Sequence, residues 1–329
     1  MFLAGDLGGT KTILAEFEPT VDGMKTVRES KFASRAYPTF SAMLAEFLAS
    51  RTGRPLKSAC FGVAGTVVNG VCHTTNLPWA LDDRVLAGTI GVARVKLLND
   101  LEATAYGVLT LPASDLAVLN PGASPSPSRA GNVAVVAAGT GLGEALLYWD
   151  GTHYHPIASE GGHADFAPTT ERQIELWRFL RGQAGDHVSG EKVLSGPGFL
   201  NIYHFLRDEK GHDEPSWLAE EIRSGSANAV ISAHGLAGGV PLCVETVTLF
   251  ASIYGAEAGN AALRYLAAGG VFLAGGIAPK LLPMLRSGAF LDAFARKGRF
   301  HDFLAGLEVS VSLNPKAALQ GAAHYALRL

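Results

Sequence analysis

The sequence LAGDLGGT at Leu3–Thr10 decides the fold class of this 329-residue chain. An apolar run ends at a carboxylate, two glycines follow, and a second apolar run begins at Thr12, so the order predicts strand, glycine turn, strand. Consecutive glycines between strands let backbone N–H groups converge on an anion, because no Cβ blocks positive φ or close approach. The stretch therefore predicts a phosphate-binding hairpin, although a plain hairpin turn accounts for a single such loop equally well.

A second stretch repeats this layout. VVAAGTGLG at Val135–Gly143 is followed by the strand-like run Glu144–Trp149, and the repeat indicates two similar halves. The loop is close to a dinucleotide-binding motif, with Glu160 about twenty residues further on. We reject that interpretation because the third glycine comes one position early and the next run ends at Asp150-Gly151, like a hairpin strand. Both loops therefore predict phosphate binding.

A third glycine cluster, LAGGI at Leu273–Ile277, follows a predicted strand. Gly275 and Gly276 there are consistent with either a close-packing turn or a surface for a flat nucleotide base.

Short apolar runs alternate with helical periods along the chain, which predicts an α/β fold. The predicted strands are Phe2–Asp6, Ile13–Phe17, Ser58–Val63, Val95–Leu98, Val133–Ala138, Ala145–Trp149, Val271–Ala274 and Glu308–Leu313, and the predicted helices are Thr39–Ser50, Leu101–Thr110, Thr170–Ala184, Glu245–Ala267 and Ala317–Leu327. The segment Asn120–Arg129 is rich in proline and serine, which predicts a linker with a domain boundary before it.

The amino-acid composition limits the classes of function that the chain can have. Hydrophobic residues make up 48% and charged residues 17% of the chain, which predicts a compact globule and excludes a disordered polymer. The 27 basic and 30 acidic residues are nearly balanced and form no cluster of five Lys or Arg, so we expect small ligands and no nucleic acid. We expect no membrane partner and a cytoplasmic location, because no apolar stretch reaches bilayer length, no secretory signal precedes Asp6 and the three cysteines suit reduced thiols.

Polar residues follow two of the predicted strands. Asp6 stands at the mouth of the first loop, where a carboxylate would bind Mg²⁺ or its water shell, or would cap the turn. Asn99-Asp100 lies between the run Val95–Leu98 and a helix, at the strand end where α/β sheets place ligands. Asp100 could serve as a base for an attacking hydroxyl, and an ordinary helix N-cap is the alternative for the pair.

Four further residues complete the candidate site. Glu160 and His163 flank a glycine pair, a spacing that suits neighbouring hydroxyls of a polyol. Glu191 and Asn76 join them, with a capping box after Ser189 and a turn before proline as the respective alternatives. No cysteine or histidine set supports zinc.

As a set, these motifs resemble the bacterial glucokinases of the hexokinase-like, actin-type ATPase superfamily, nearly end to end. The resemblance implies a two-domain actin-like ATPase (ribonuclease H-like) fold with an interdomain cleft, a small α/β domain of residues 1–110 plus 313–329 and a large one of residues 111–312. Homodimers occur in that family.

The resemblance also implies ATP-dependent phosphorylation of D-glucose to glucose 6-phosphate, with Mg²⁺ and with Asp100 as general base. It assigns sugar hydroxyls to Glu160, His163 and Glu191, and we expect Asn76 and Asn99 to bind the sugar with them. We expect ATP to be bound by Gly5, Asp6, Leu7, Gly8, Gly9, Thr10, Gly139, Thr140, Gly141, Gly275 and Gly276, with Asp6 contacting Mg²⁺ through water. The alternatives are a kinase for another hexose and a non-catalytic sugar-sensing protein on the same fold.

Overall fold

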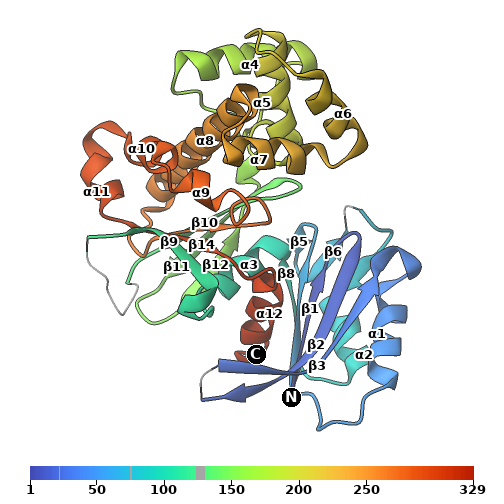
Figure 1. Ribbon diagram of the computed structural model, residues 1–329. Helices are drawn as coiled ribbons and strands as arrows, with labels where there is room; N and C mark the ends of the chain where they lie inside the picture. Colours follow the sequence, from blue (N-terminus) through green and yellow to red (C-terminus); the bar gives the residue numbers. More distant parts are fainter. Residues whose placement is uncertain (22, 75, 124–129) are drawn as a thin grey trace. The chain divides into compact units, whose positions relative to one another are not determined.

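The computed structural model describes residues 1–21, 23–74, 76–123 and 130–329 (Figure 1). Most of the predicted linker, residues 124–129, lies outside the described residues. The described chain divides into two compact units. Unit 1 comprises Met1–Asp115, Tyr154–Ala158 and Asn314–Leu329, and unit 2 comprises Leu116–His153 and Ser159–Leu313. The predicted small domain ends at residue 110 and resumes at residue 313, whereas unit 1 ends at Asp115 and resumes at Asn314. Unit 1 also includes Tyr154–Ala158, which the prediction places in the large domain.

Unit 1 is built on a five-stranded sheet in the order β3-β2-β1-β4-β8. Its strands are β1 (Phe2–Leu7), β2 (Lys11–Thr20), β3 (Gly23–Ala33), β4 (Ser58–Val63) and β8 (Val95–Asn99). The predicted hairpin is confirmed, because β1 and β2 are antiparallel and Leu7 pairs with Thr12 beside the glycine turn. Strands β1, β4 and β8 run parallel, and their register places Leu7, Val63 and Asn99 level with one another. The residues at the carboxyl ends of β1 and β8 therefore lie at the same end of the sheet, on either side of β4.

Helices pack on the faces of this sheet. They are α1 (Phe40–Ala49), α2 (Asp83–Ile90), α3 (Asp100–Val108) and α12 (Ala317–Leu327), with a small sheet of β5 (Val67–Val68), β6 (Val71–His73) and β7 (Ala80–Asp82). Helices α3 and α12 lie side by side (Figure 1). Gly107 and Gly321 allow this approach, because a Cβ at either position would collide with a carbonyl group of the opposite helix.

The second sheet has the order β12-β11-β10-β13-β14-β9, and all its strands except β12 belong to unit 2. The strands are β9 (Leu116–Pro121), β10 (Val133–Ala138), β11 (Leu142–Trp149), β12 (Tyr154–Ala158), β13 (Val271–Ala274) and β14 (Glu308–Ser312). As predicted, β10 and β11 form an antiparallel hairpin around the second glycine loop. The sequence-based α/β fold class is confirmed.

The core of unit 2 surrounds α8 (Pro241–Tyr265), whose central residues are almost all buried. The other helices are α4 (Glu171–Ala184), α5 (Gly196–Asp208), α6 (Ser216–Ser224), α7 (Ala227–Ala237), α9 (Leu282–Leu285), α10 (Ala289–Ala295) and α11 (His301–Ala305). Helices α4 to α7 gather around one end of α8 (Figure 1). No single helix of the described residues is long and apolar enough to cross a membrane, although α7 and α8, bent by 98° at their junction, pass that test together.

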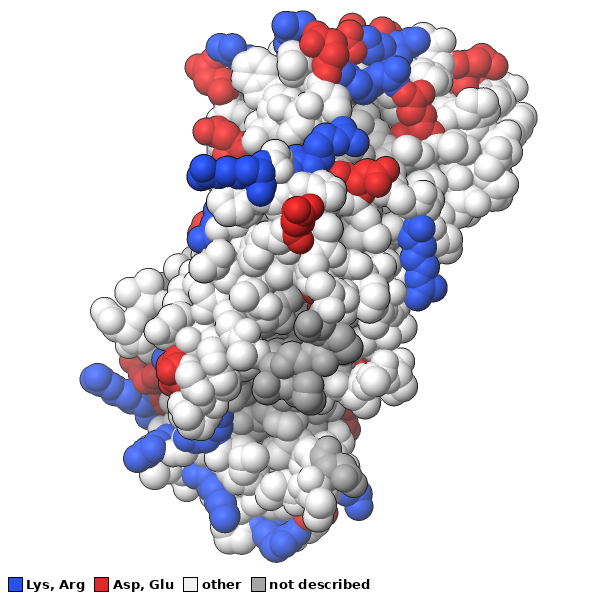
Figure 2. Space-filling model, turned by 90° about the vertical axis from the view of Figure 1, so that its left-hand side faces the viewer, with Lys and Arg blue, Asp and Glu red and all other residues white. Residues whose placement is uncertain are grey.

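The surface charge is mixed. On the face in Figure 2, Lys and Arg side chains stand singly or beside Asp and Glu, with broad uncharged areas between them. This face offers no continuous basic track for a nucleic-acid backbone.

Candidate functional site

The first glycine loop is a tight turn with little room for side chains. Gly8 N–H donates to the carbonyl of Lys11 at 3.1 Å, and Ser34 Oγ donates to the carbonyl of Gly8 at 2.7 Å. A Cβ at Gly9 would lie 2.9 Å from Cβ of Asn76, so this predicted sugar residue packs directly on the loop. Gly5 belongs to β1 instead, where a Cβ would crowd Phe61 and Leu14, so the structure places it in sheet packing.

The carboxyl group of Asp6 is affected by that of Asp100 at this end of the sheet. Burial and then the negative charge of Asp100 raise the pKa of Asp6 to about 6, and Lys11 opposes the shift. The two acids come from the carboxyl ends of β1 and β8, which lie on either side of β4. Oxygen donors of this kind suit a hard divalent cation.

The N-terminus of α3 shows how Asn99 and Asp100 divide their roles. Asn99 is the N-cap: its Oδ1 accepts from Leu101 N–H at 2.9 Å, and Glu102 Oε2 accepts from Asn99 N–H at 2.8 Å, which completes a capping box. Asn99 Nδ2 donates to the carbonyl of Gly65 at 3.2 Å. Asp100 is the first helical residue, and one of its oxygens also accepts from Leu101 N–H at 2.9 Å. The N-cap interpretation thus holds for Asn99, whereas the cap does not depend on Asp100.

The second glycine loop and Glu191 are joined through Leu142. Glu191 Oε2 accepts from Leu142 N–H at 3.0 Å, and a Cβ at Gly141 would collide with the same oxygen. Gly196 N–H donates to the carbonyl of Gly139 at 2.8 Å. The alternative role of Glu191 in a capping box is wrong, because Ser189 makes no side-chain cap bond.

The Ser159–His163 turn rests on the start of β11. Ser159 Oγ donates to the carbonyl of Glu144 at 2.8 Å and accepts from Gly161 N–H at 3.1 Å. Gly162 is buried against the backbone of Leu142, where a Cβ would collide. The side chains of Glu160 and His163 are exposed. The turn that carries Glu160 and His163, and also Glu191, thus contacts the start of β11 at Leu142 or Glu144.

A cavity of about 410 Å³ opens beside the second glycine loop within unit 2. Its wall includes Gly139, Thr140 and Gly276, as predicted for a nucleotide. Gly275 does not line it: with φ at +80° and the backbone of Ala138 against its α-carbon, Gly275 serves the turn itself.

Several residues that line this cavity could not be predicted from sequence motifs. Asn228 Nδ2 donates to the carbonyl of Gly196 at 3.0 Å, while its buried Oδ1 has no hydrogen-bond partner among the described residues. Ser226, Ser232 and Lys280 supply further polar groups. None belongs to a motif; only the position of Lys280, four residues after Gly276, could have drawn attention to it.

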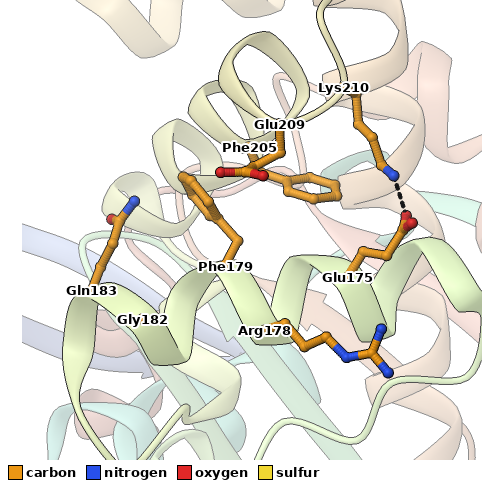
Figure 3. Close-up of a pocket in the computed structure, with 8 residues that line it drawn as sticks. All are labelled: Glu175, Arg178, Phe179, Gly182, Gln183, Phe205, Glu209 and Lys210. Carbon is orange, nitrogen blue, oxygen red and sulfur yellow. Dashed lines mark ion pairs between the residues drawn. The ribbon is translucent and has the colours of Figure 1, made fainter.

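A second cavity, of about 530 Å³, lies between α4 and α5 and contains none of the predicted residues (Figure 3). The rings of Phe179 and Phe205 lie 5.7 Å apart in it, and Lys210 pairs with Glu175 at 2.5 Å. Because these two charged groups already pair with each other, we do not place the functional site there.

Comparisons with known proteins agree on one family. The family model described as Glucokinase matches residues 3–329. A glucokinase of Trichormus variabilis is 40% identical over 100% of this chain and 99% of its own, and one of Synechocystis sp. is 39% identical over 98% and 96%. The crystal structure of a glucokinase from an Antarctic psychrotroph superposes with a TM-score of 0.87 at 26% identity, covering 100% of this chain and 99% of the other. This chain therefore belongs to the glucokinase family.

Proposed function

We propose that this chain transfers the γ-phosphoryl group of ATP to the 6-hydroxyl of D-glucose. The observation that carries the proposal is the match of the glucokinase family to residues 3–329. In this reaction the 6-hydroxyl oxygen attacks the γ-phosphorus, the bond from that phosphorus to ADP breaks, and the hydroxyl proton leaves to a base.

Asp100 is the proposed base. Because Asn99 and Glu102 cap α3, the Asp100 carboxylate is not required to close the helix end. Positioned proton acceptors of this kind contribute about 10²–10⁴-fold to a rate. The charge of Asp100 also disfavours proton loss from Asp6, so the pair attracts a cation.

The unit 2 residues would bind glucose and ATP. Glu160, His163 and Glu191 suit the sugar hydroxyls because Glu191 and the turn that carries the other two all contact the start of β11. Asn76 and Asn99 are the other sugar-binding residues of the proposal and belong to unit 1. The cavity beside Gly139, Thr140 and Gly276 has the size and polarity for a nucleoside, and the two glycine loops would direct N–H groups to phosphates.

The residues at the first loop fit a magnesium ion. Asp6 and Asp100 offer hard oxygen donors at one end of the sheet, and the raised pKa of Asp6 reflects a site that favours added positive charge. Asp6 would hold the water shell of the ion. Mg²⁺, when bound, neutralises charge on the β- and γ-phosphates.

A coupled ADP-release assay on a panel of hexoses tests the function. We expect the highest kcat/KM with glucose, and no ADP release with any sugar would contradict the proposal in favour of a sugar-sensing protein. A higher kcat/KM for a different hexose would instead assign that sugar as substrate.

Asp100→Asn tests the base. The amide can still accept from Leu101 N–H, so the fold and the affinity for glucose should persist while kcat falls by about 10²-fold or more. Glu102→Gln is the matched control, since it keeps the acceptor of the capping box and should keep kcat. Equal turnover of wild type and Asp100→Asn would refute the role of Asp100.

A further inference from the structure

A buried ionic cluster lies beneath the Ser159–His163 turn, and none of its members has a role in the proposed chemistry. Glu144 on β11 has a side chain 1% exposed, and its Oε2 accepts from Arg264 Nη1 at 3.2 Å. Glu257 on α8 accepts from the same nitrogen at 2.8 Å through Oε1. Glu144 Oε1 is buried and accepts from no donor among the described residues.

One guanidinium group therefore faces two carboxyl groups. Burial raises the pKa of Glu144 above its usual range, the charge of Glu257 and a hydrogen bond between the two carboxyl groups raise it further, and Arg264 opposes the shift. One guanidinium group cannot neutralise two ionised carboxylates, and Glu144 Oε1 is buried without a donor among the described residues, so the cluster holds one proton between the two carboxyl groups.

The other charged and titratable groups around the pair do not replace that proton. Lys297 is linked to the cluster by hydrogen bonds through Asn260, whose Oδ1 accepts from the ammonium group at 2.6 Å and whose Nδ2 donates to Glu257 Oε2 at 3.0 Å. Burial lowers the pKa of Lys297. Tyr254 and Tyr265 also face Glu144. Burial raises the pKa of both hydroxyls, so both side chains stay neutral and cannot offset the charge of the carboxyl groups.

The carboxyl group of Glu144 also lies against the turn above it. A Cβ on Gly161 would lie 2.6 Å from Glu144 Oε2, so the turn backbone lies directly on this oxygen. Ser159 Oγ binds the carbonyl of Glu144 and holds the amide of Gly161. A change in the position of the carboxyl group therefore moves the residues next to Glu160 and His163.

We propose that Glu144, sharing one proton with Glu257, is a positioning residue that holds the glucose-binding turn Ser159–His163 in place. The proposal rests on the proposed function, which assigns Glu160 and His163 to glucose. Loss of the shared proton would leave two adjacent negative charges for one Arg264, and their repulsion would displace Glu144 against Gly161. The consequence is a selective loss of glucose affinity at alkaline pH.

Steady-state kinetics of the full chain between about pH 6 and pH 10 test this. In wild type, KM for glucose should rise on the alkaline side with a limiting slope of about tenfold per pH unit, while kcat and KM for ATP change far less. Glu144→Gln stays neutral and can donate to Glu257, so its glucose KM should match wild type near pH 7 and stay flat above. Glu144→Ala should raise glucose KM at every pH.

Glu16→Gln is the matched control, because Glu16 is a buried strand carboxylate bound to Arg28 and Arg51 in unit 1. It should keep the alkaline rise in glucose KM. An unchanged alkaline rise in Glu144→Gln would overturn the proposal, as would a glucose KM near pH 7 as high as that of Glu144→Ala.

A measurement without turnover separates this proposal from the proposed function. The infrared C=O stretching band of a protonated, buried carboxyl group should be present in wild type near pH 7 and reduced in Glu144→Gln. Hydrogen exchange of residues 159–163, corrected for its intrinsic pH dependence, should accelerate at alkaline pH in wild type only. If the sugar panel releases no ADP, the proposed function fails while these two readouts still decide the role of Glu144; identical bands and exchange in both proteins would refute it.

Discussion

We predict that the substitution Asp6→Asn makes the protein more stable and less active. Burial and the charge of Asp100 raise the pKa of Asp6 from 3.8 to about 6. A carboxyl group whose pKa is raised by folding contributes stability that is complete below its unfolded pKa and is lost as pH rises through its folded pKa. The loss for Asp6 therefore falls between about pH 4 and pH 6.

The magnitude follows from the size of that shift. A change of about 2 pKa units corresponds to about 3 kcal/mol, and partial solvent contact of Asp6 reduces this to about 2 kcal/mol. Asn has nearly the same shape and carries no charge, so Asp6→Asn should recover this free energy of unfolding at pH 8. The gain should shrink to about half at pH 5, where the wild-type carboxyl group is already partly protonated.

Urea unfolding and thermal unfolding in the presence of a chelator and without nucleotide provide the assay. At pH 8 the Tm of Asp6→Asn should exceed that of wild type by roughly 4–8 °C. Added Mg²⁺ should raise the wild-type Tm and leave the variant unchanged, while the variant loses phosphoryl transfer. A variant no more stable than wild type at pH 8, or a gain of the same size at pH 5, would refute the electrostatic reasoning.

Two further predictions concern glycines in opposite situations. Gly321→Ala places a methyl group against the carbonyl of Ala103, so α12 must move off α3 and the free energy of unfolding should fall by about 1–3 kcal/mol; an unchanged urea midpoint would contradict this contact. At Gly276 a Cβ would meet no atom within 4 Å, and Gly276→Val adds a side chain to the cavity wall, so KM for ATP should rise about tenfold or more while Tm stays within roughly 1 °C. An unchanged KM for ATP would place the nucleotide elsewhere.

Much of the fold could be predicted because its signals are local. Strands β4, β10 and β13 lie inside sheets and are continuous apolar runs, and their predicted limits are those observed. Strand β3 was missed because this edge strand is largely exposed and reads GMKTVRESKFA, with little apolar alternation. Helix α5 was missed because it opens with Gly-Pro-Gly, which is typical of a loop; Pro at the start of a helix is tolerated because no N–H is needed there.

The residues of the candidate site were also predictable only in part. The sequence identified Asp6, Asp100 and the two glycine hairpins because each lies directly after an apolar strand. It did not show that Asn99 and Glu102 close α3, because the choice of cap depends on side-chain geometry at the helix end. Nor did it show Glu144, whose partner Glu257 is far away in the chain.

The sequence by itself determined the α/β class, both hairpins and the family, because these depend on residue types at short and regular spacings. The tertiary structure alone decided which glycines serve packing and which line a cavity, and which carboxyl groups share a proton. Those properties depend on neighbours brought together from distant segments, such as Gly5 with Phe61, Asn228 with Gly196 and Glu144 with Glu257. Burial among such neighbours sets steric room and the local dielectric response, and neither is encoded at any single position.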